Sequence, residues 1–191
     1  MPIPGFNSNL VLPPHLGDPR RPAELSPYPC TAVELCRRFA TSPARITILD
    51  GLLRLRKALR LHGMTSGFQW IAGSFTEDIE TSESRDPQDI DVVTFYWYTD
   101  PLFNYSFRTA FPQSVDRNRI KADYHVDHFM VDTLFRPEAT VEQTRYWYGL
   151  FSHKRSDLWK GMLRLELDTE VDDIAALASL SQMSGPAGVT P

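Results

Sequence analysis

The sequence lacks any apolar run long enough to cross a membrane. Hydrophobic residues make up 42% of its 191 residues, but charge interrupts the longest apolar runs within about ten residues, whereas a transmembrane helix needs about 20. The N-terminal segment MPIPGFNSNL also lacks the basic start and apolar stretch of a secretory signal. We therefore expect a cytoplasmic protein without a membrane partner.

The sequence also has few cysteines and no excess of basic residues. Cys30 and Cys36 are the only cysteines, too few for a disulfide framework or for a structural zinc site built on two cysteine pairs. Both are expected to be free thiols. Lysine and arginine number 20 against 24 acidic residues, for a net charge of -4. This balance disfavours a protein that mainly binds nucleic acid.

What the sequence does contain is the composition of a globular protein, with 23% charged and 12% aromatic residues in a chain of one-domain length. Eight of its 15 prolines fall in the first 29 residues, where they restrict the backbone and remove amide donors. That stretch is expected to be extended, and apolar residues such as Phe6 and Val11 favour its packing. We predict an arm over residues 1–41, a domain over 42–183 and a flexible tail over 184–191.

After the arm, helical and strand patterns alternate. Ser42 as a cap and Pro43 as the first helical residue predict a helix to about His62, with leucines at helical spacing. Periodicity and turn residues predict the remaining elements. These are strands over 68–72, 89–95, 126–134 and 161–167, a loop over 77–88, and helices over 114–124, 138–150 and 170–180. The pattern indicates an α/β domain with a short mixed β-sheet flanked by helices.

Two carboxylates alternate on the second predicted strand. Asp89 and Asp91 are two residues apart, so their side chains point to one face, with α-carbons roughly 6 to 7 Å apart. Their repulsion disfavours ionising both unless a cation neutralises them, and carboxylate oxygens together with substrate phosphates suit Mg²⁺. An exposed strand edge with solvated acids is the alternative interpretation.

Phosphate binding and a third carboxylate are predicted beside this pair. Gly73 and Ser74 directly follow the first strand, where a glycine and a small hydroxyl let backbone amides approach phosphate oxygens. The third strand offers Asp127 and Asp132 as a further metal-binding carboxylate. These two are an odd number of residues apart, so only one of them can face the pair.

The order of these motifs resembles the nucleotidyltransferase superfamily typified by DNA polymerase β and the small antitoxin nucleotidyltransferases. That superfamily has a Gly-Ser after a strand, an Asp-apolar-Asp on the next strand and a later single carboxylate. The matching segments here are Ala72–Phe75, Asp89–Val92 and Val126–His128. A closer resemblance is to an uncharacterised bacterial subfamily, a domain of unknown function (DUF6932-like). Its proline-rich arm, Gly-Ser-Phe-Thr turn and C-terminal segment resemble those of this chain.

The resemblance implies a mechanism with two Mg²⁺ ions, held by Asp89, Asp91 and Asp127, the last of which helps to activate a hydroxyl. That hydroxyl would attack a nucleoside triphosphate and move NMP or dNMP to a protein, RNA or nucleotide acceptor. Gly73 and Ser74 would position the outer phosphates. Relatives in the superfamily suggest a toxin–antitoxin or phage-defence setting. The alternative is a non-catalytic, antitoxin-like interaction protein with the same fold, and either function is compatible with a homo-oligomer.

Basic side chains near the C-terminus are further candidates for phosphate binding. Lys154, Arg155 and Lys160 could supply positive charge to the leaving pyrophosphate. The alternative interpretation is a solvated turn before the last strand. A second basic group is interpreted as the solvated face of the helix over 114–124, and it consists of Arg117, Arg119 and Lys121.

Aromatic and histidine residues are given structural interpretations. The tracts Phe95–Tyr98 and Tyr146–Tyr148 are expected to pack in the core or an interface rather than to stack on a nucleobase. His125 and His128 flank the third carboxylate, but their odd spacing on a strand places them on opposite faces and argues against zinc. His128 is expected to orient a carboxylate or to be half-buried.

Overall fold

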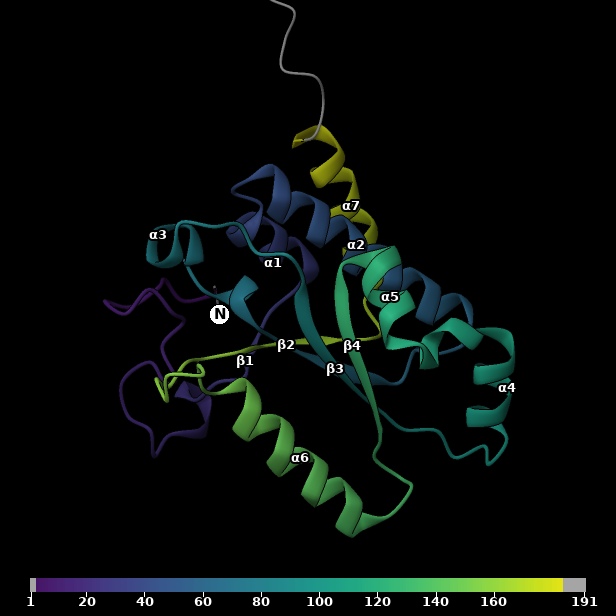
Figure 1. Ribbon diagram of the computed structural model, residues 1–191. Helices are drawn as coiled ribbons and strands as arrows, with labels where there is room; N and C mark the ends of the chain where they lie inside the picture. The colour runs from purple at the N-terminus through teal and green to yellow at the C-terminus, as the bar shows by residue number, and fades with distance from the viewer. Residues whose placement is uncertain (1–2, 184–191) are drawn as a thin grey trace, which may run out of the picture.

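A five-stranded sheet runs through the molecule in the order β1–β5–β2–β3–β4, in a computed structural model that describes residues 3–183 (Figure 1). The strands are β1 (Tyr28–Pro29), β2 (Gly67–Ala72), β3 (Ile90–Tyr96), β4 (Val126–Asp132) and β5 (Leu163–Glu166). The pairs β1–β5 and β3–β4 are parallel, whereas β5–β2 and β2–β3 are antiparallel. The predicted α/β architecture with a short mixed sheet is confirmed.

The helices flank this sheet, as predicted. The α-helices are α1 (Ala32–Phe39), α2 (Pro43–Leu61), α3 (Ile79–Glu83), α4 (Phe103–Ala110), α5 (Arg117–Tyr124), α6 (Pro137–Phe151) and α7 (Glu170–Met183). Short 3-10 helices are η1 (Pro22–Glu24), η2 (Ser74–Thr76) and η3 (Pro112–Val115). Within residues 3–183, every helix is too short or too polar to cross a bilayer.

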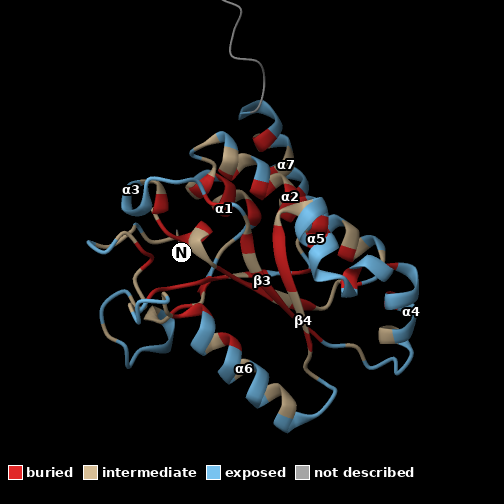
Figure 2. Ribbon diagram, in the orientation of Figure 1, coloured by how far each residue is buried: buried red, intermediate tan, exposed pale blue. Residues whose placement is uncertain are grey.

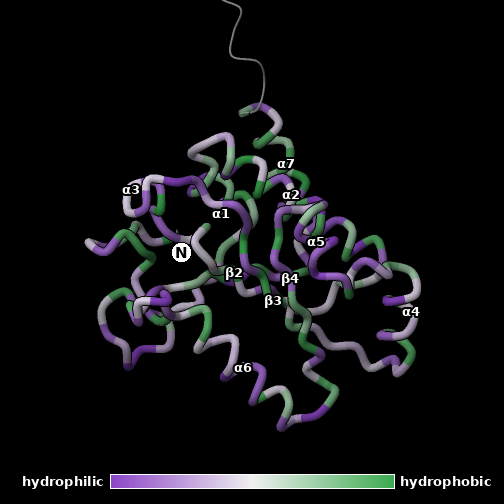
Figure 3. The backbone as a smooth tube through the Cα atoms, in the orientation of Figure 1, coloured by the Kyte–Doolittle hydropathy of each residue, from purple (hydrophilic) through white to green (hydrophobic). Residues whose placement is uncertain are grey.

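Each face of the sheet has its own hydrophobic core. One core joins buried residues of α1, α2, α5 and α7 to Ile71 and Val92 of the sheet. The other joins Trp147 and Phe151 of α6 to Val93. Val92 and Val93 belong to different cores because successive strand residues point to opposite faces. Figure 2 shows the buried central strands, and Figure 3 the apolar segments of α2 and the strands.

The N-terminal arm packs along the edge of the sheet. The amide of Tyr28 donates to the carbonyl of Met162 at 2.9 Å, and that of Cys30 donates to the carbonyl of Arg164 at 2.9 Å. Leu12 is fully buried in the larger core. These segments therefore pack against the sheet, while the predicted tail over 184–191 lies outside the described residues. Both cysteine thiols are free, as expected.

Side-chain caps explain where predicted helices begin and break. The hydroxyl of Ser42 accepts from the amide of Arg45 at 3.3 Å, so α2 begins at Pro43 as predicted. The helix predicted over 114–124 is instead two pieces, η3 and α5. Asp116 separates them because it has extended backbone and caps α5. The four predicted strands are present as β2 to β5, with ends within two residues of the predicted ones.

Two helices lie in segments that the sequence pattern predicts to be extended arm or loop. α1 lies inside the proline-rich arm and begins with a capping box, in which Thr31 and Glu34 bond reciprocally to each other's backbone amides. α3 lies inside the predicted loop over 77–88, where Asp78 caps a single short turn of helix. α1 also buries an apolar stripe of Ala32, Leu35, Cys36 and Phe39, which the high proline content of the arm masked in the sequence. α3 buries only Ile79, too little for hydrophobic periodicity to predict it.

Candidate functional site

Three neighbouring strands bring the predicted site residues into one row. Ala72 pairs with Asp91 across the antiparallel β2–β3 ladder. Asp91 pairs in turn with Asp127 across the parallel β3–β4 ladder. Laterally paired residues present their side chains on the same face, here the face that carries α6. Asp91 and Asp127 are therefore side by side, and Gly73 follows directly after Ala72.

The backbone of Gly73 approaches the Asp91 carboxylate so closely that only glycine fits at this position. Its backbone has φ +85°, and a Cβ built there would lie 2.3 Å from Oδ2 of Asp91. A side chain would be strained by the dihedral angle and would clash with the carboxylate. Glycine thus lets the turn between β2 and η2 pack against Asp91, with Ser74 as the next residue at the site.

These residues line a cleft of about 880 Å³. All eight site residues predicted from the sequence line it, namely Gly73, Ser74, Asp89, Asp91, Asp127, Lys154, Arg155 and Lys160. The cleft also contains acidic and basic side chains that were not predicted, namely Glu77, Glu83, Arg85, Arg117 and Lys121. The site is therefore strongly charged and carries both signs.

Burial and neighbouring charges disfavour ionisation of Asp91, one of the three acids of the carboxylate row (Asp89, Asp91 and Asp127). Its pKa is raised from 3.8 to about 6 by burial, and further by the negative charges of Asp89 and Asp127. The three carboxylates therefore repel one another, as expected for side chains crowded on one face. A cation bound among them would relieve this repulsion.

Two cations from α5 pair with the other two carboxylates. Arg117 donates through Nε and Nη2 to the two carboxylate oxygens of Asp127, and Lys121 pairs with Asp89. Hydrogen bonding to these carboxylates raises the pKa of both cations. The interpretation of all three α5 cations as a solvated face is therefore wrong for these two. Only Arg119 fits it, since it is exposed and pairs with Asp123 of its own helix.

The sequence spacing of the α5 cations could have shown that Arg117 and Lys121 differ from Arg119. Positions 117 and 121 are four apart and share a helix face, whereas position 119 lies on another. The helix can approach the site because Gly51 of α2 leaves room for it. A Cβ at Gly51 would lie 1.9 Å from the carbonyl oxygen of Tyr124, the last residue of α5.

An ion cluster of Lys160, Glu77 and Lys154 holds the Gly73 turn in place. Lys160 donates to Oε1 of Glu77 at 2.5 Å and to the carbonyl of Gly73 at 3.0 Å, and Lys154 lies 2.9 Å from Oε2 of Glu77. Burial opposes ionisation of Glu77, but the two ammonium groups outweigh it and lower its pKa. Lys160 thus holds the turn, whereas Arg155 is exposed at the rim and has no ion pair within residues 3–183.

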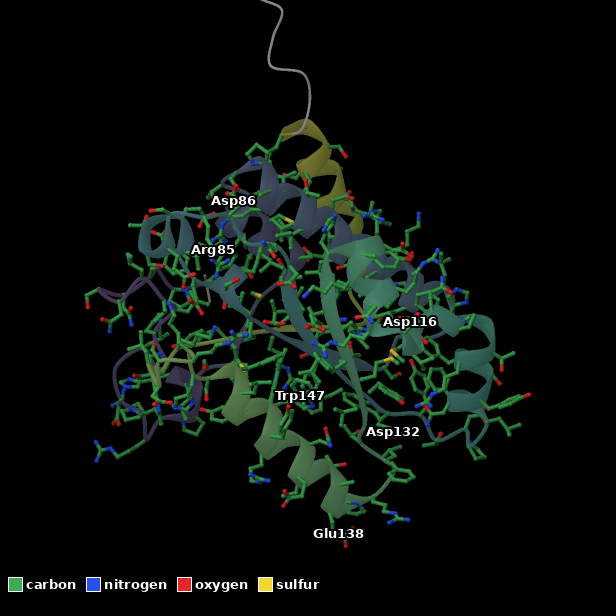
Figure 4. The ribbon with its side chains drawn as sticks, in the orientation of Figure 1. Arg85, Asp86, Asp116, Asp132, Glu138 and Trp147 are labelled. Atoms are coloured by element: carbon green, nitrogen blue, oxygen red, sulfur yellow. The ribbon has the colours of Figure 1, made fainter. Side chains whose placement is uncertain are left out.

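The structure selects between the two candidates for the third carboxylate. Asp132 lies at the C-terminal end of β4 (Figure 4), where it accepts from Nδ2 of Asn104 at 2.7 Å. It does not line the cleft, which Asp127 does. The odd spacing of the two residues places only Asp127 beside Asp91.

The aromatic and histidine residues have structural environments. Trp147 points from α6 toward the sheet (Figure 4), and its ring centroid lies 4.4 Å from that of Phe129. It therefore packs as expected, and it also lines the cleft. His128 is buried, rather than half-buried, and its Nε2 lies 2.7 Å from the hydroxyl of Thr94. It thus contacts a hydroxyl rather than a carboxylate. His125 precedes β4 in a left-handed conformation.

The donor set of the row suits Mg²⁺, which prefers carboxylate oxygens. Among residues 3–183, no group of three Asp, Glu, His or Cys side chains converges closely enough to hold a metal ion with the present side-chain positions. In those positions Asp89 is paired with Lys121 and Asp127 with Arg117. The residues therefore match the metal in chemistry, and its binding would require these two ion pairs to open.

Comparison with known proteins identifies one family. The model of a family described as "Family of unknown function (DUF6932)" matches residues 4–166, a stretch that contains the whole cleft. This match confirms the resemblance to that subfamily seen in the sequence. Searches of curated proteins and of solved structures found no match.

Proposed function

We propose that this chain, which belongs to the family of unknown function DUF6932, is a Mg²⁺-dependent nucleotidyltransferase. One observation carries the proposal: the turn at Gly73 and the carboxylates of Asp91 and Asp127 occupy adjoining positions on three neighbouring strands. In this proposal the Gly73 turn binds phosphate beside the carboxylates that bind the metal. The motif order alone could not decide whether these elements meet.

Asp89, Asp91 and Asp127 are the side chains that would hold the metal. Bound divalent cations would neutralise phosphate charge and make the acceptor hydroxyl easier to deprotonate. The chain itself supplies carboxylates that are held close together before any ligand arrives. The raised pKa of Asp91 reflects its burial first and this crowding second, and both would favour a cation bound beside it.

The proposed transfer moves one nucleotidyl group without redox change. The acceptor hydroxyl oxygen forms a bond to the α-phosphorus, and the bond from that phosphorus to the oxygen bridging to the β-phosphate breaks. Pyrophosphate leaves with the electron pair of the broken bond, and Asp127 accepts the hydroxyl proton. Gly73 and Ser74 position the outer phosphates from the neighbouring strand.

The cleft cations have separate roles in this proposal. Lys160 is buried against Glu77 and the Gly73 carbonyl, so it positions the turn instead of contacting the ligand. Lys154 is partly exposed and Arg155 is exposed. Both line the cleft, and in this proposal they contact the departing pyrophosphate. By analogy with the superfamily, the acceptor is a protein, an RNA or a nucleotide, in a toxin–antitoxin or phage-defence setting.

A second candidate function is binding without chemistry. The observation that favours it is that two of the three carboxylates already have a cationic partner, Lys121 for Asp89 and Arg117 for Asp127. A scaffold that binds a protein partner, as an antitoxin does, needs no metal and could retain these pairs permanently. The two functions therefore differ in whether a divalent cation enters the row.

The test incubates the purified protein with each α-³²P-labelled ribo- and deoxyribonucleoside triphosphate and Mg²⁺, with and without total RNA and cell lysate. The Asp91→Asn variant removes a row carboxylate. The matched control is Asp132→Asn, which makes the same change on the neighbouring strand outside the cleft. We expect Mg²⁺-dependent label transfer by the wild type and the control, and none by Asp91→Asn. Transfer that survives in Asp91→Asn, or is absent from every reaction, would contradict the enzyme proposal.

A further inference from the structure

The two ion pairs between α5 and the carboxylate row are uneven in burial. Arg117 and Lys121 leave 57% and 48% of their side chains exposed, whereas their partners Asp127 and Asp89 expose 8% and 20%. The carboxylates belong to the floor of the cleft. The cations contact them directly from α5, and the guanidinium of Arg117 also lies 4.6 Å from the ring centroid of Phe129.

This difference in burial predicts which member of each ion pair needs the other in order to stay charged in the folded protein. A carboxylate with little access to water needs a counter-charge, because burying it unpaired is costly. A half-exposed cation loses little when it leaves, because water solvates it and an exposed ion pair contributes only about 0 to 1 kcal/mol. The carboxylates therefore need some cation, but they do not need these two.

The ion pair of Lys160 with Glu77 differs in this respect. Lys160 and Glu77 each expose only 5% of their side chains, and Lys160 also donates to the carbonyl of Gly73. Breaking this pair would leave the Lys160 ammonium buried without a counter-charge, whereas Glu77 would keep Lys154 as a partner. The pair beneath the turn is therefore fixed, in contrast to the two pairs that α5 makes with half-exposed cations.

We propose that Arg117 and Lys121 are exchangeable counter-ions of the site. In the metal-free protein they neutralise Asp127 and Asp89, and when Mg²⁺ takes over these carboxylates the two side chains turn to the phosphates of the substrate. This inference rests on the proposed function and identifies the ligand class as a metal-bound triphosphate. Metal and triphosphate bring opposite charge, so the exchange leaves every buried carboxylate and both cations with partners.

The exchange predicts effects of opposite sign on metal and triphosphate binding. Replacing Arg117 or Lys121 by glutamine removes a competitor for the carboxylates, so divalent cations should bind the variant more tightly, by about five-fold. The same replacement removes a charged contact to phosphate, so the triphosphate should bind about ten-fold more weakly. A residue that merely stabilised the carboxylates would weaken both.

The experiment measures binding rather than catalysis. Mn²⁺ is titrated into the full chain without nucleotide and followed by electron paramagnetic resonance. A non-reactive α,β-methylene analogue of ATP is then titrated in saturating Mn²⁺ by calorimetry. The variants are Arg117→Gln and Lys121→Gln, with Lys121→Arg as the charge-conserving replacement. The matched control is Arg119→Gln, which makes the same charge change on the same helix but lies beside Asp123.

We expect tighter Mn²⁺ binding and weaker analogue binding in Arg117→Gln and Lys121→Gln, and near-wild-type values in Lys121→Arg and Arg119→Gln. The exchange is wrong if the two glutamine variants match Arg119→Gln, or if their Mn²⁺ affinity falls. These outcomes are independent of nucleotidyl transfer. Transfer by a protein whose glutamine variants behave like the control would overturn the exchange alone, whereas exchange without transfer would overturn the enzyme proposal alone.

Discussion

The Asp91 carboxylate occupies the space that a side chain on Gly73 would need, with 2.3 Å between its Oδ2 and the position of a Cβ on that glycine. Gly73 directly follows β2 and Asp91 lies on the neighbouring strand β3, 18 positions later in the chain. Their contact joins the turn after β2 to the carboxylates of β3 and β4.

Gly73→Ala should destabilise the protein by about 1 to 3 kcal/mol, because it adds a clash to a backbone conformation with φ +85°. Urea denaturation measures the loss. The control is Gly149→Ala in α6, where a Cβ meets nothing within 4 Å and alanine should add up to about 1 kcal/mol through helix propensity. Equal effects of the two substitutions would contradict the close approach at Gly73.

Asp91→Asn should stabilise the metal-free protein at pH 7.5, by about 1 to 3 kcal/mol. The pKa of Asp91 is raised in the folded protein from 3.8 to about 6. Between pH 3.8 and about 6 the folded state therefore binds more protons than the unfolded chain. The free energy of unfolding falls as pH rises through this range. The destabilisation by ionised Asp91 is fully present above about pH 6 and absent below pH 3.8.

Denaturant titrations between pH 3.5 and 7.5 measure this difference, and the two proteins should converge at the acid end. Adding Mg²⁺ at pH 7.5 should raise the melting temperature of the wild type but not that of Asp91→Asn, because the cation relieves a repulsion that the variant lacks. A variant that is less stable than the wild type at pH 7.5 would show that the carboxylates do not repel.

His128 should make the protein sensitive to acid. Burial lowers the pKa of His128 from 6.5 to about 4, so between these values the unfolded chain takes up a proton that the folded state does not. Stability is therefore lost as pH falls through this window, by up to about 3 kcal/mol. His128→Gln should abolish this loss in denaturant titrations. It should also unmask the opposite contribution of Asp91, so that the variant becomes more stable from pH 6 to 4. If His128→Gln leaves the pH dependence of stability unchanged, His128 is not the group that causes the loss in acid.

Glu77→Gln should destabilise the protein by about 3 to 5 kcal/mol, since it leaves the Lys160 ammonium buried without its counter-charge. Replacing both partners, as Glu77→Gln with Lys160→Met, should recover part of this loss. The exposed pair of Arg164 and Glu166 is the control, where Glu166→Gln should change stability by less than about 1 kcal/mol. Thermal unfolding compares the variants, and additive losses in the double variant would argue against a coupled pair.

Local signals in the sequence predicted the elements that depend on neighbouring residues. The Ser42 cap, Pro43 and the leucine spacing predicted α2, and the alternation of Asp89 and Asp91 predicted their shared face. α1 was missed although its capping box at Thr31 and Glu34 is also a local signal. The wider helix predicted around α5 was wrong at Asp116, where a side-chain cap competes with helix continuation.

The sequence by itself placed Asp89 and Asp91 on one strand face and a Gly-Ser turn after the preceding strand, because both features are properties of adjacent positions. Only the tertiary structure decided how they meet. The register of β4 on β3 brought Asp127, and not Asp132, beside Asp91. The packing of α5 on α2 at Gly51 placed Arg117 and Lys121 over the carboxylates. Register and helix packing depend on contacts between residues far apart in the chain, and no local pattern encodes such contacts.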